Sequence, residues 1–193
     1  MNDLPESMLP IGVGLCLSAA CGFRTFLPLL FVGVASRLGA FPLNEAYSWI
    51  GSTAGLLVLL TATVTEIVAY FVPFVDNASD AIATPLAIGA GTLMMLTSLG
   101  DSGGVIPWAL ALVLGGGTAG IVQGMTVKLR ALSSGVTAGT GNAVVAGGEL
   151  VGASTFSLVA LLMPVIALTV SLIFLAIVVR VLMKLRRARP APR

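Results

Sequence analysis

The chain has 193 residues, of which 57% are hydrophobic and only 9% are charged. A soluble domain carries roughly 25% charged residues, so this chain has too few polar side chains to cover its surface in water. The net charge is +2, but six of the ten basic residues lie in the last fourteen positions. Without a basic face outside that tail, we expect no nucleic-acid partner. The chain contains no histidine, which excludes histidine proton relays, histidine metal sites and histidine general bases.

This composition predicts an all-α fold, a polytopic transmembrane helical bundle that forms a single domain over residues 1–193 with the lipid bilayer as its first partner. At about 20 residues for each crossing, the length allows roughly five or six spans. We expect about six membrane segments, some of them broken or re-entrant. Lys and Arg collect on the cytoplasmic side of membrane proteins, so the basic tail at residues 184–193 predicts a cytoplasmic C-terminus. With six crossings, the N-terminus lies on the same side.

The first apolar run covers residues 8–36 and contains one charge, Arg24. As one upright helix it would measure roughly 44 Å against about 30 Å of hydrocarbon, so it is tilted, broken or divided. Cys21-Gly22 and Pro28 flank Arg24 and predict a break there. An arginine inside a span costs roughly 2.5–3.5 kcal/mol unless it faces protein, water or an acid.

The second span is predicted over residues 47–72, and Pro73 ends it. Glu66 lies inside this span and is the most deeply placed carboxylate of the chain. We therefore expect an ion pair between Arg24 and Glu66 that joins the first two helices. Two interpretations stay open: the pair only locks the helices together, or one of its members binds a substrate or a coupling ion.

Asp76 and Asp80 are four residues apart, so both carboxylates share one face if the chain is helical there. One interpretation is a solvated helix start, with Asn77, Ser79 or Asp80 capping a third span over residues 82–99. The other is a cation site, because two carboxylates one turn apart can share a divalent ion. The Asp-x-x-x-Asp spacing also occurs in membrane enzymes that hold magnesium against a lipid diphosphate. The basic signature of those enzymes is missing upstream, so we expect no enzyme and no cofactor, and leave the metal open.

In the third span, Pro85 is predicted in the first turn, where proline is tolerated. A glycine-rich turn leads to the fourth span, residues 105–123. Small residues recur every four positions from the end of this span, a pattern that lets another helix approach closely within the chain or in a homodimer. These residues are Gly116, Gly120 and Gly124.

Residues 131–148 are rich in Gly, Ser and Thr and have weak helix propensity. A count of six crossings requires this segment to span, and the alternative is a broken or re-entrant segment buried in protein. It contains Asn142 and lies between Arg130 and Glu149, so it is a candidate for a broken helix that lines a site.

The last apolar run, residues 151–183, is predicted to kink at Pro164. An arginine, a glutamate and a proline also follow one another twice along the chain, which indicates a possible weak inverted repeat. The two sets are Arg24, Glu66, Pro73 and Arg130, Glu149, Pro164.

Several short motifs, taken in order over roughly residues 19–164, form one pattern: Gly22-Phe23-Arg24-Thr25-Phe26, Glu66, Pro73, Val75-Asp76, Asp80, Pro85, Gly89, Arg130-Ala131, Thr137-Ala138-Gly139, Asn142 and Glu149. This pattern resembles a bacterial membrane family known as domain-of-unknown-function family 4126. The resemblance implies an all-helical protein of the bacterial inner membrane and supplies no activity. Members of that family often carry an acid–base pair before the proline, where this chain has Tyr70-Phe71.

Ionisable and small polar side chains inside apolar spans mark substrate and ion pathways. They predict a small ion or solute transporter or channel. The alternative is a non-transporting structural or assembly protein, a homo-oligomer packed through the stripe of small residues. The expected substrate- or ion-binding residues are Arg24, Glu66, Asp76, Asp80, Arg130, Asn142 and Glu149.

Overall fold

The computed structural model describes residues 8–71, 75–100 and 105–187, and the regular structure in these ranges is helical. The predicted helical bundle is confirmed, with four helical stretches long and apolar enough to cross a membrane: Thr53–Tyr70, Ile82–Leu99, Val105–Thr137 and Asn142–Leu162. In chain order, the helices are α1 (Met8–Phe23), α2 (Leu27–Arg37), η1 (Glu45–Gly51), α3 (Thr53–Phe71), α4 (Val75–Leu99), α5 (Val105–Leu110), η2 (Ala111–Gly116), α6 (Gly117–Thr137), α7 (Asn142–Leu162) and α8 (Pro164–Arg187).

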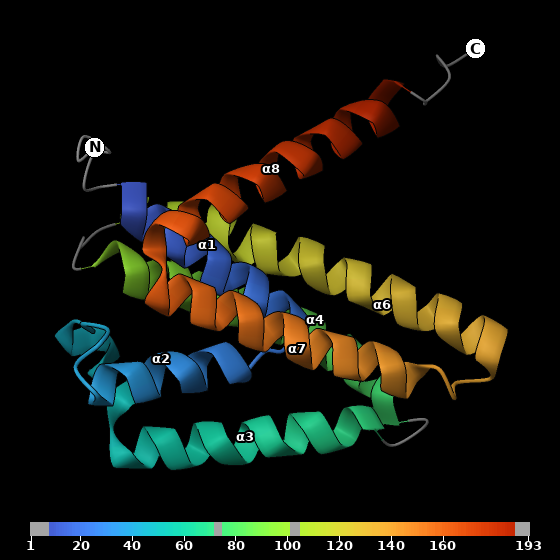
Figure 1. The fold of residues 1–193 in the computed structure, drawn as a ribbon, viewed down its shortest axis with the longest axis horizontal. Coiled ribbons are helices and arrows are strands. Elements are labelled where there is room, and N and C mark those ends of the chain that lie inside the picture. Colours follow the sequence, from blue (N-terminus) through green and yellow to red (C-terminus); the bar gives the residue numbers. More distant parts are fainter. Residues whose placement is uncertain (1–7, 72–74, 101–104, 188–193) are drawn as a thin grey trace.

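The first two helices form a re-entrant hairpin. In Figure 1, α1 runs from one end of the bundle to its middle, the chain reverses at residues 24–26, and α2 returns to the same end. Their 16 and 11 residues measure about 24 and 16 Å, too short to cross about 30 Å of hydrocarbon. The break predicted at Arg24 is therefore confirmed, and the run divides into two antiparallel pieces.

Helix α1 forms the core of the bundle. All its residues from Gly12 to Gly22 are buried, and it packs against α4, α6, α7 and α8. Glycine allows these helices to approach closely, since a Cβ on Gly22 would lie 2.5 Å from the Ala119 carbonyl oxygen of α6. The Ser18 hydroxyl lies 2.8 Å from the Gly91 carbonyl oxygen of α4. A helix that is apolar all round is buried in this way by its neighbours.

The small-residue stripe packs against α4 of the same chain. A Cβ on Gly116 would lie 2.7 Å from Thr92 Oγ1, and one on Gly120 would lie 3.2 Å from Ile88 Cγ1, whereas Gly124 has open space around it. The close packing predicted from the four-residue period thus occurs inside the protomer at two of the three glycines. A homodimer through this stripe stays a prediction.

The start of the third span differs from the prediction. Helix α4 already begins at Val75, so Asn77, Ser79 and Asp80 lie within it and do not cap its start. Pro85 lies inside the helix instead of in its first turn. A proline removes one backbone hydrogen bond, and membrane helices tolerate this loss because neighbouring groups satisfy the freed carbonyl.

Residues 131–148 neither cross nor re-enter the membrane as a segment of their own. Helix α6 continues to Thr137, and α7 begins at Asn142 and crosses back. Between them, Ala138 and Gly139 adopt left-handed conformations with φ of 52° and 89°, the usual way to end a helix. The weak helix propensity of this segment is therefore a poor guide to its structure.

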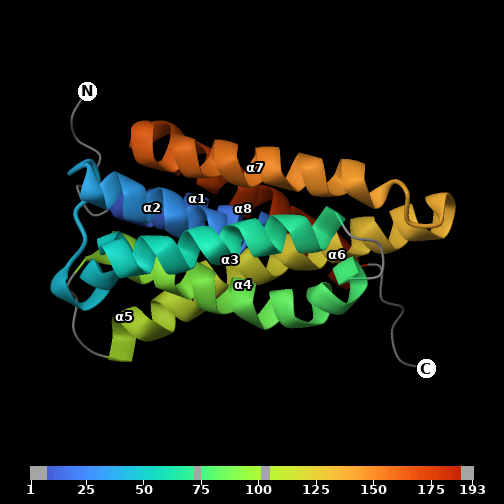
Figure 2. The same cartoon turned by 90° about the horizontal axis from the view of Figure 1, so that it is seen from below.

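The last apolar run is divided at Met163, between α7 and α8. Pro164 begins α8, and the chain turns back sharply there, a larger change of direction than the predicted kink (Figure 1). The hairpin, α3, α4, the continuous α5–η2–α6 stretch, α7 and α8 make six segments. Because the hairpin does not cross, the start of α1 and the end of α8 lie at different ends of the bundle (Figure 2), unlike the arrangement expected for six full crossings.

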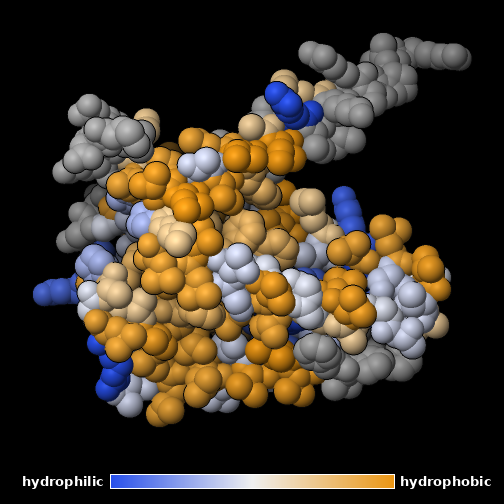
Figure 3. Space-filling view, viewed as in Figure 1, coloured by the Kyte–Doolittle hydropathy of each residue, from blue (hydrophilic) through white to orange (hydrophobic). Residues whose placement is uncertain are grey.

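Apolar side chains cover most of the face seen in Figure 3. The exposed large hydrophobic residues of α3 include Leu57, Val58, Leu60, Val64 and Val68. An exposed apolar surface of this extent is typical of a protein surrounded by lipid.

Candidate functional site

The tip of the hairpin is held by Glu66 of α3. The backbone N–H of Thr25 donates to Glu66 Oε1 at 2.7 Å, and that of Phe26 donates to Oε2 at 3.1 Å. The first N–H groups of a helix have no partner within the helix, and no side chain of α2 itself caps its start at Phe26. Glu66 therefore caps α2 from a neighbouring helix, and its negative charge lies at the positive end of the helix dipole.

The Arg24 side chain points away from Glu66 and toward α7, inside the bundle. It is 1% exposed, and its Nη2 donates to the Ala146 carbonyl oxygen at 2.8 Å. The same nitrogen lies 3.5 Å from Glu149 Oε2 on α7. The predicted ion pair between Arg24 and Glu66 is therefore wrong, because the carboxylate paired with Arg24 is Glu149.

Arg130 of α6 binds the same carboxylate through two nitrogens. Its Nε donates to Glu149 Oε1 at 3.0 Å, and its Nη2 donates to Oε2. This two-point geometry fixes the planes of the guanidinium and the carboxylate relative to each other. All three side chains are buried, and two guanidiniums share one carboxylate at membrane depth.

The ring of Tyr70 contacts both guanidiniums. The Cζ atoms of Arg24 and Arg130 lie 4.3 and 3.8 Å from the centre of the ring. Such contacts are attractive because the aromatic face carries partial negative charge, and the attraction grows when water is excluded. The polar cluster, as we name it from here, consists of Arg24, Tyr70, Arg130 and Glu149, which come from the hairpin tip, α3, α6 and α7.

Two buried side chains near this region keep hydrogen-bond donors without an acceptor among the described residues. They are Arg24, through Nε and Nη1, and Gln123 of α6, through Nε2. Gln123 is 2% exposed and lies seven residues before Arg130, on the same face of α6. A buried donor without an acceptor costs roughly 1–3 kcal/mol. Such donors favour the binding of a ligand or water that carries acceptors.

The other predicted site residues divide into two groups. Asn142 is buried at the start of α7, on the face that also carries Ala146 and Glu149, and its Nδ2 donates to Ser134 Oγ at 2.8 Å. This bond ties the ends of α6 and α7 together beside the polar cluster. The side chains of Asp76 and Asp80 lie outside the described residues, so the cation site proposed for them stays a prediction. Among the described side chains, no three of His, Cys, Asp and Glu come together.

Sequence reasoning missed Tyr70 and Gln123. Tyr70 lies four residues after Glu66, so the two share a face of α3, and this spacing was the available signal. Gln123 is the single amide in its long apolar run, which was the signal on α6. Neither signal says which partner the side chain meets.

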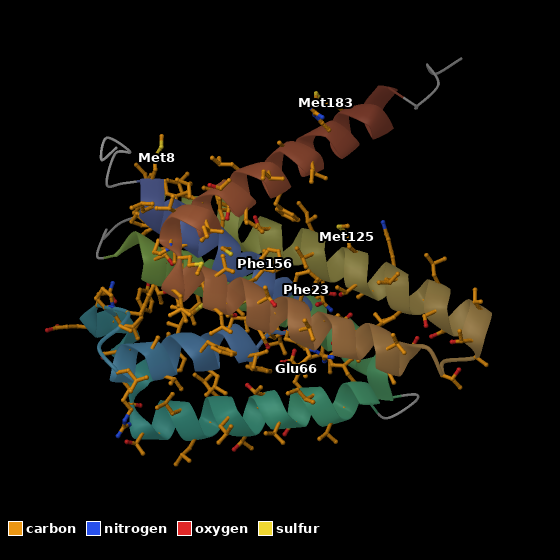
Figure 4. All side chains as sticks on the ribbon, viewed as in Figure 1. Met8, Phe23, Glu66, Met125, Phe156 and Met183 are labelled. Carbon is orange, nitrogen blue, oxygen red and sulfur yellow. The ribbon has the colours of Figure 1, made fainter. Side chains whose placement is uncertain are left out.

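A groove between α3 and α4 opens beside the cluster, with a cavity of about 660 Å³. Its walls are mostly apolar and include the exposed residues Leu57, Val58 and Ile82. Glu66 and Tyr70 also line it, so the groove reaches both the hairpin tip and the polar cluster. Figure 4 shows Glu66 near the middle of the bundle, as Phe23 is.

The sequence model of one protein family, described as "Domain of unknown function (DUF4126)", matches residues 11–184. No curated protein and no solved structure matches the chain.

Proposed function

Because the chain belongs to the DUF4126 family, whose description assigns no function, we propose from the geometry of the site that it is a membrane transporter or channel for a small ion or polar solute. The observation that carries this proposal is the polar cluster, in which ionisable side chains from the hairpin tip, α6 and α7 are buried together inside apolar helices. Ionisable groups inside membrane spans are rare, and they mark ion and substrate pathways.

The re-entrant hairpin supports the same proposal. Transporters bind substrates near the middle of the bilayer, where discontinuous helices end and leave backbone groups available. Here α1 ends and α2 begins in the middle of the bundle (Figure 1). Arg24 lies at that break, and its Nη2 is 3.5 Å from Glu149 Oε2.

The donors of Arg24 indicate the chemistry of the substrate. Its Nε and Nη1 have no acceptor among the described residues, and it shares its carboxylate with Arg130. We therefore propose that the substrate presents acceptor oxygens or a negative charge, as a small anion or a carbonyl-bearing solute does. The proposal includes no catalytic step.

We further propose a bacterial inner-membrane location with the C-terminus in the cytoplasm. The support is the distribution of basic residues, because Lys128 lies in the second half of α6 and α8 ends in a basic segment with Lys184, Arg186 and Arg187. The turn after α6 lies at the end of the bundle away from the start of α1 (Figure 1), and α8 runs back toward it. One side of the membrane thus collects most Lys and Arg, as the cytoplasmic side does.

The test is a thermal-shift titration of the full chain in lipid nanodiscs against anions, cations and small polar solutes. A ligand of the folded state raises the melting temperature with concentration. We expect an acceptor-bearing compound to do so in the wild type and in Glu45→Gln, which removes an exposed acid, and to lose this effect in Arg24→Lys and Glu149→Gln. The same compound is then expected to cross proteoliposome membranes that contain the wild type.

Two results would reject the proposal. The first is a panel in which no compound shifts the wild type while Glu149→Gln is merely less stable, which makes the cluster a structural lock and favours the assembly role. The second is a ligand that binds at the cluster without any flux into proteoliposomes. Arg24→Lys keeps the charge near Glu149, so it separates lost binding from lost folding if Glu149→Gln does not fold.

A further inference from the structure

The groove between α3 and α4 combines apolar walls with one carboxylate. Among the residues whose side chains the structure describes, Glu66 is the single charged residue of the lining, and no lysine or arginine of that set lines the groove. Leu57, Val58 and Ile82 are 60%, 65% and 64% exposed, so in a bilayer this groove opens sideways to lipid. A cavity of about 660 Å³ is within the range that holds one ligand of moderate size.

Glu66 keeps hydrogen-bonding capacity toward the groove. It is partly exposed, and it accepts hydrogen bonds from the backbone N–H groups of Thr25 and Phe26 and from the Thr25 hydroxyl. A carboxylate has about four acceptor positions, so roughly one is left. No ion pair joins Glu66 to another described side chain within 4 Å. A carboxylate that faces hydrocarbon without an ion pair is costly unless a hydrogen-bond donor reaches it.

Two threonine hydroxyls extend the polar floor of the groove. Thr61 and Thr65 line it on α3, one turn apart and on the side of Glu66. The Thr61 hydroxyl donates to the Leu57 carbonyl oxygen, which leaves its lone pairs as acceptors. Both hydroxyls offer acceptor lone pairs beside a negative charge, and the surrounding walls are mostly apolar.

We propose that this groove binds a lipophilic amine, a single-chain amphiphile whose ammonium head donates to Glu66 and whose chain lies along the apolar walls of α3 and α4. An ammonium group supplies three donors and a positive charge. The charge-assisted bond it forms with a carboxylate is strong where water is excluded. The ligand enters sideways from the bilayer, and this binding does not depend on the transport of a polar solute.

The proposal is tested with the full chain in nanodiscs and a photoreactive C12 primary amine. Labelled peptides of α3 and α4 are identified by mass spectrometry over a range of concentrations. We expect saturable labelling of the groove, with half-saturation at a concentration about tenfold or more below that of the C12 alcohol, which corresponds to at least about 1.4 kcal/mol. The C12 carboxylic acid is expected to give no saturable labelling.

Two variants and one control separate binding from folding. Ala62→Phe fills the groove and leaves Glu66 in place, so saturable labelling is expected to disappear. Ala54→Phe makes the same change at an exposed position of α3 outside the groove and is expected to label as the wild type does. Glu66→Gln is expected to raise the half-saturating amine concentration to that of the alcohol.

The proposal is overturned if amine labelling persists in Ala62→Phe, or if it never saturates in the wild type. It is also overturned if the alcohol binds as well as the amine, because the charge of Glu66 then has no role. Preferential labelling by the carboxylic acid would have the same consequence and would point to Arg24 as the group that attracts ligands. If Glu66→Gln does not fold, the comparison of Ala62→Phe with Ala54→Phe still shows whether the amine binds in the groove.

Discussion

Glu66 and Glu149 are the same residue type inside apolar helices, but different groups neutralise them. Glu149 is 4% exposed and binds the guanidiniums of Arg24 and Arg130, which come from two other parts of the chain. Glu66 is partly exposed to a groove and accepts two backbone N–H groups at the start of α2. Glu149 is thus stabilised by two positively charged side chains, and Glu66 by the positive end of the α2 dipole.

This difference gives the two carboxylates different roles: Glu149 connects helices, whereas Glu66 can still bind a ligand. Glu149 connects α7 to the hairpin tip and to α6, and the guanidiniums occupy both of its oxygens. Both oxygens of Glu66 also accept hydrogen bonds, from the backbone of the hairpin tip, but Glu66 keeps acceptor capacity toward the groove. A ligand that requires a carboxylate is therefore expected at Glu66, and a ligand that requires donors at Arg24.

The largest expected effect is that of Glu149→Gln. The change removes the carboxylate that both buried guanidiniums contact, and breaking a buried ion pair by removing one partner costs about 3–5 kcal/mol. We expect a loss of this size in the free energy of unfolding, measured by SDS titration in mixed micelles. A loss below about 1 kcal/mol would mean that other acceptors already neutralise Arg24 and Arg130.

A charge-free replacement of the cluster sharpens this prediction. Arg24→Met, Arg130→Met and Glu149→Leu together remove every charge at once, and such replacements of buried ion groups are often neutral or stabilising. We expect the triple variant to unfold at a higher SDS fraction than Glu149→Gln does. It should also lose the ligand-induced thermal shift, because the groups that bind the substrate are gone.

A smaller effect is expected for Glu66→Gln. The amide keeps one oxygen as an acceptor and loses the other, so one backbone N–H at the hairpin tip is left without a partner. An unsatisfied buried donor costs about 1–3 kcal/mol, and this is the expected loss in the free energy of unfolding. Amide exchange measured by mass spectrometry should rise at the start of α2 and remain unchanged in α7. A loss as large as that of Glu149→Gln would contradict the distinction between the two acids.

The general organisation of the site could be predicted from sequence because it follows from the free-energy cost of placing charged side chains inside apolar helices. Arg24 lies between Gly22 and Pro28 in a run too long for one span, and this combination predicts a break at a charge. Arg130, Asn142 and Glu149 were expected at membrane depth, and all three are buried. Length and hydropathy also predicted a helical bundle, and four of its helical stretches are long and apolar enough to cross a membrane.

The partners within the site could not be predicted, because they depend on the direction of the chain after the break. The hairpin reverses at Arg24, which turns its side chain toward α7 and leaves the backbone of residues 25–26 facing Glu66. Residues 131–148 were misassigned because their helix propensity is weak, whereas α6 and α7 both continue into this segment. Charge and hydropathy predict that a residue is buried, but they do not predict which side chain it contacts.

The smallest of the predicted effects concerns the Tyr70 ring, which contacts the guanidiniums that bind Glu149 and also lines the groove beside Glu66. Replacing Tyr70 with Leu removes the aromatic face, whereas Phe keeps it. The difference in unfolding free energy between Tyr70→Leu and Tyr70→Phe therefore reports the ring alone, and a cation–π contact is worth about 0.5–2 kcal/mol. We expect Leu to be the less stable variant by that amount, measured by SDS titration. Equal stabilities would show that the ring adds nothing measurable to the contacts of Arg24 and Arg130, and would remove it as a physical link between the two acids.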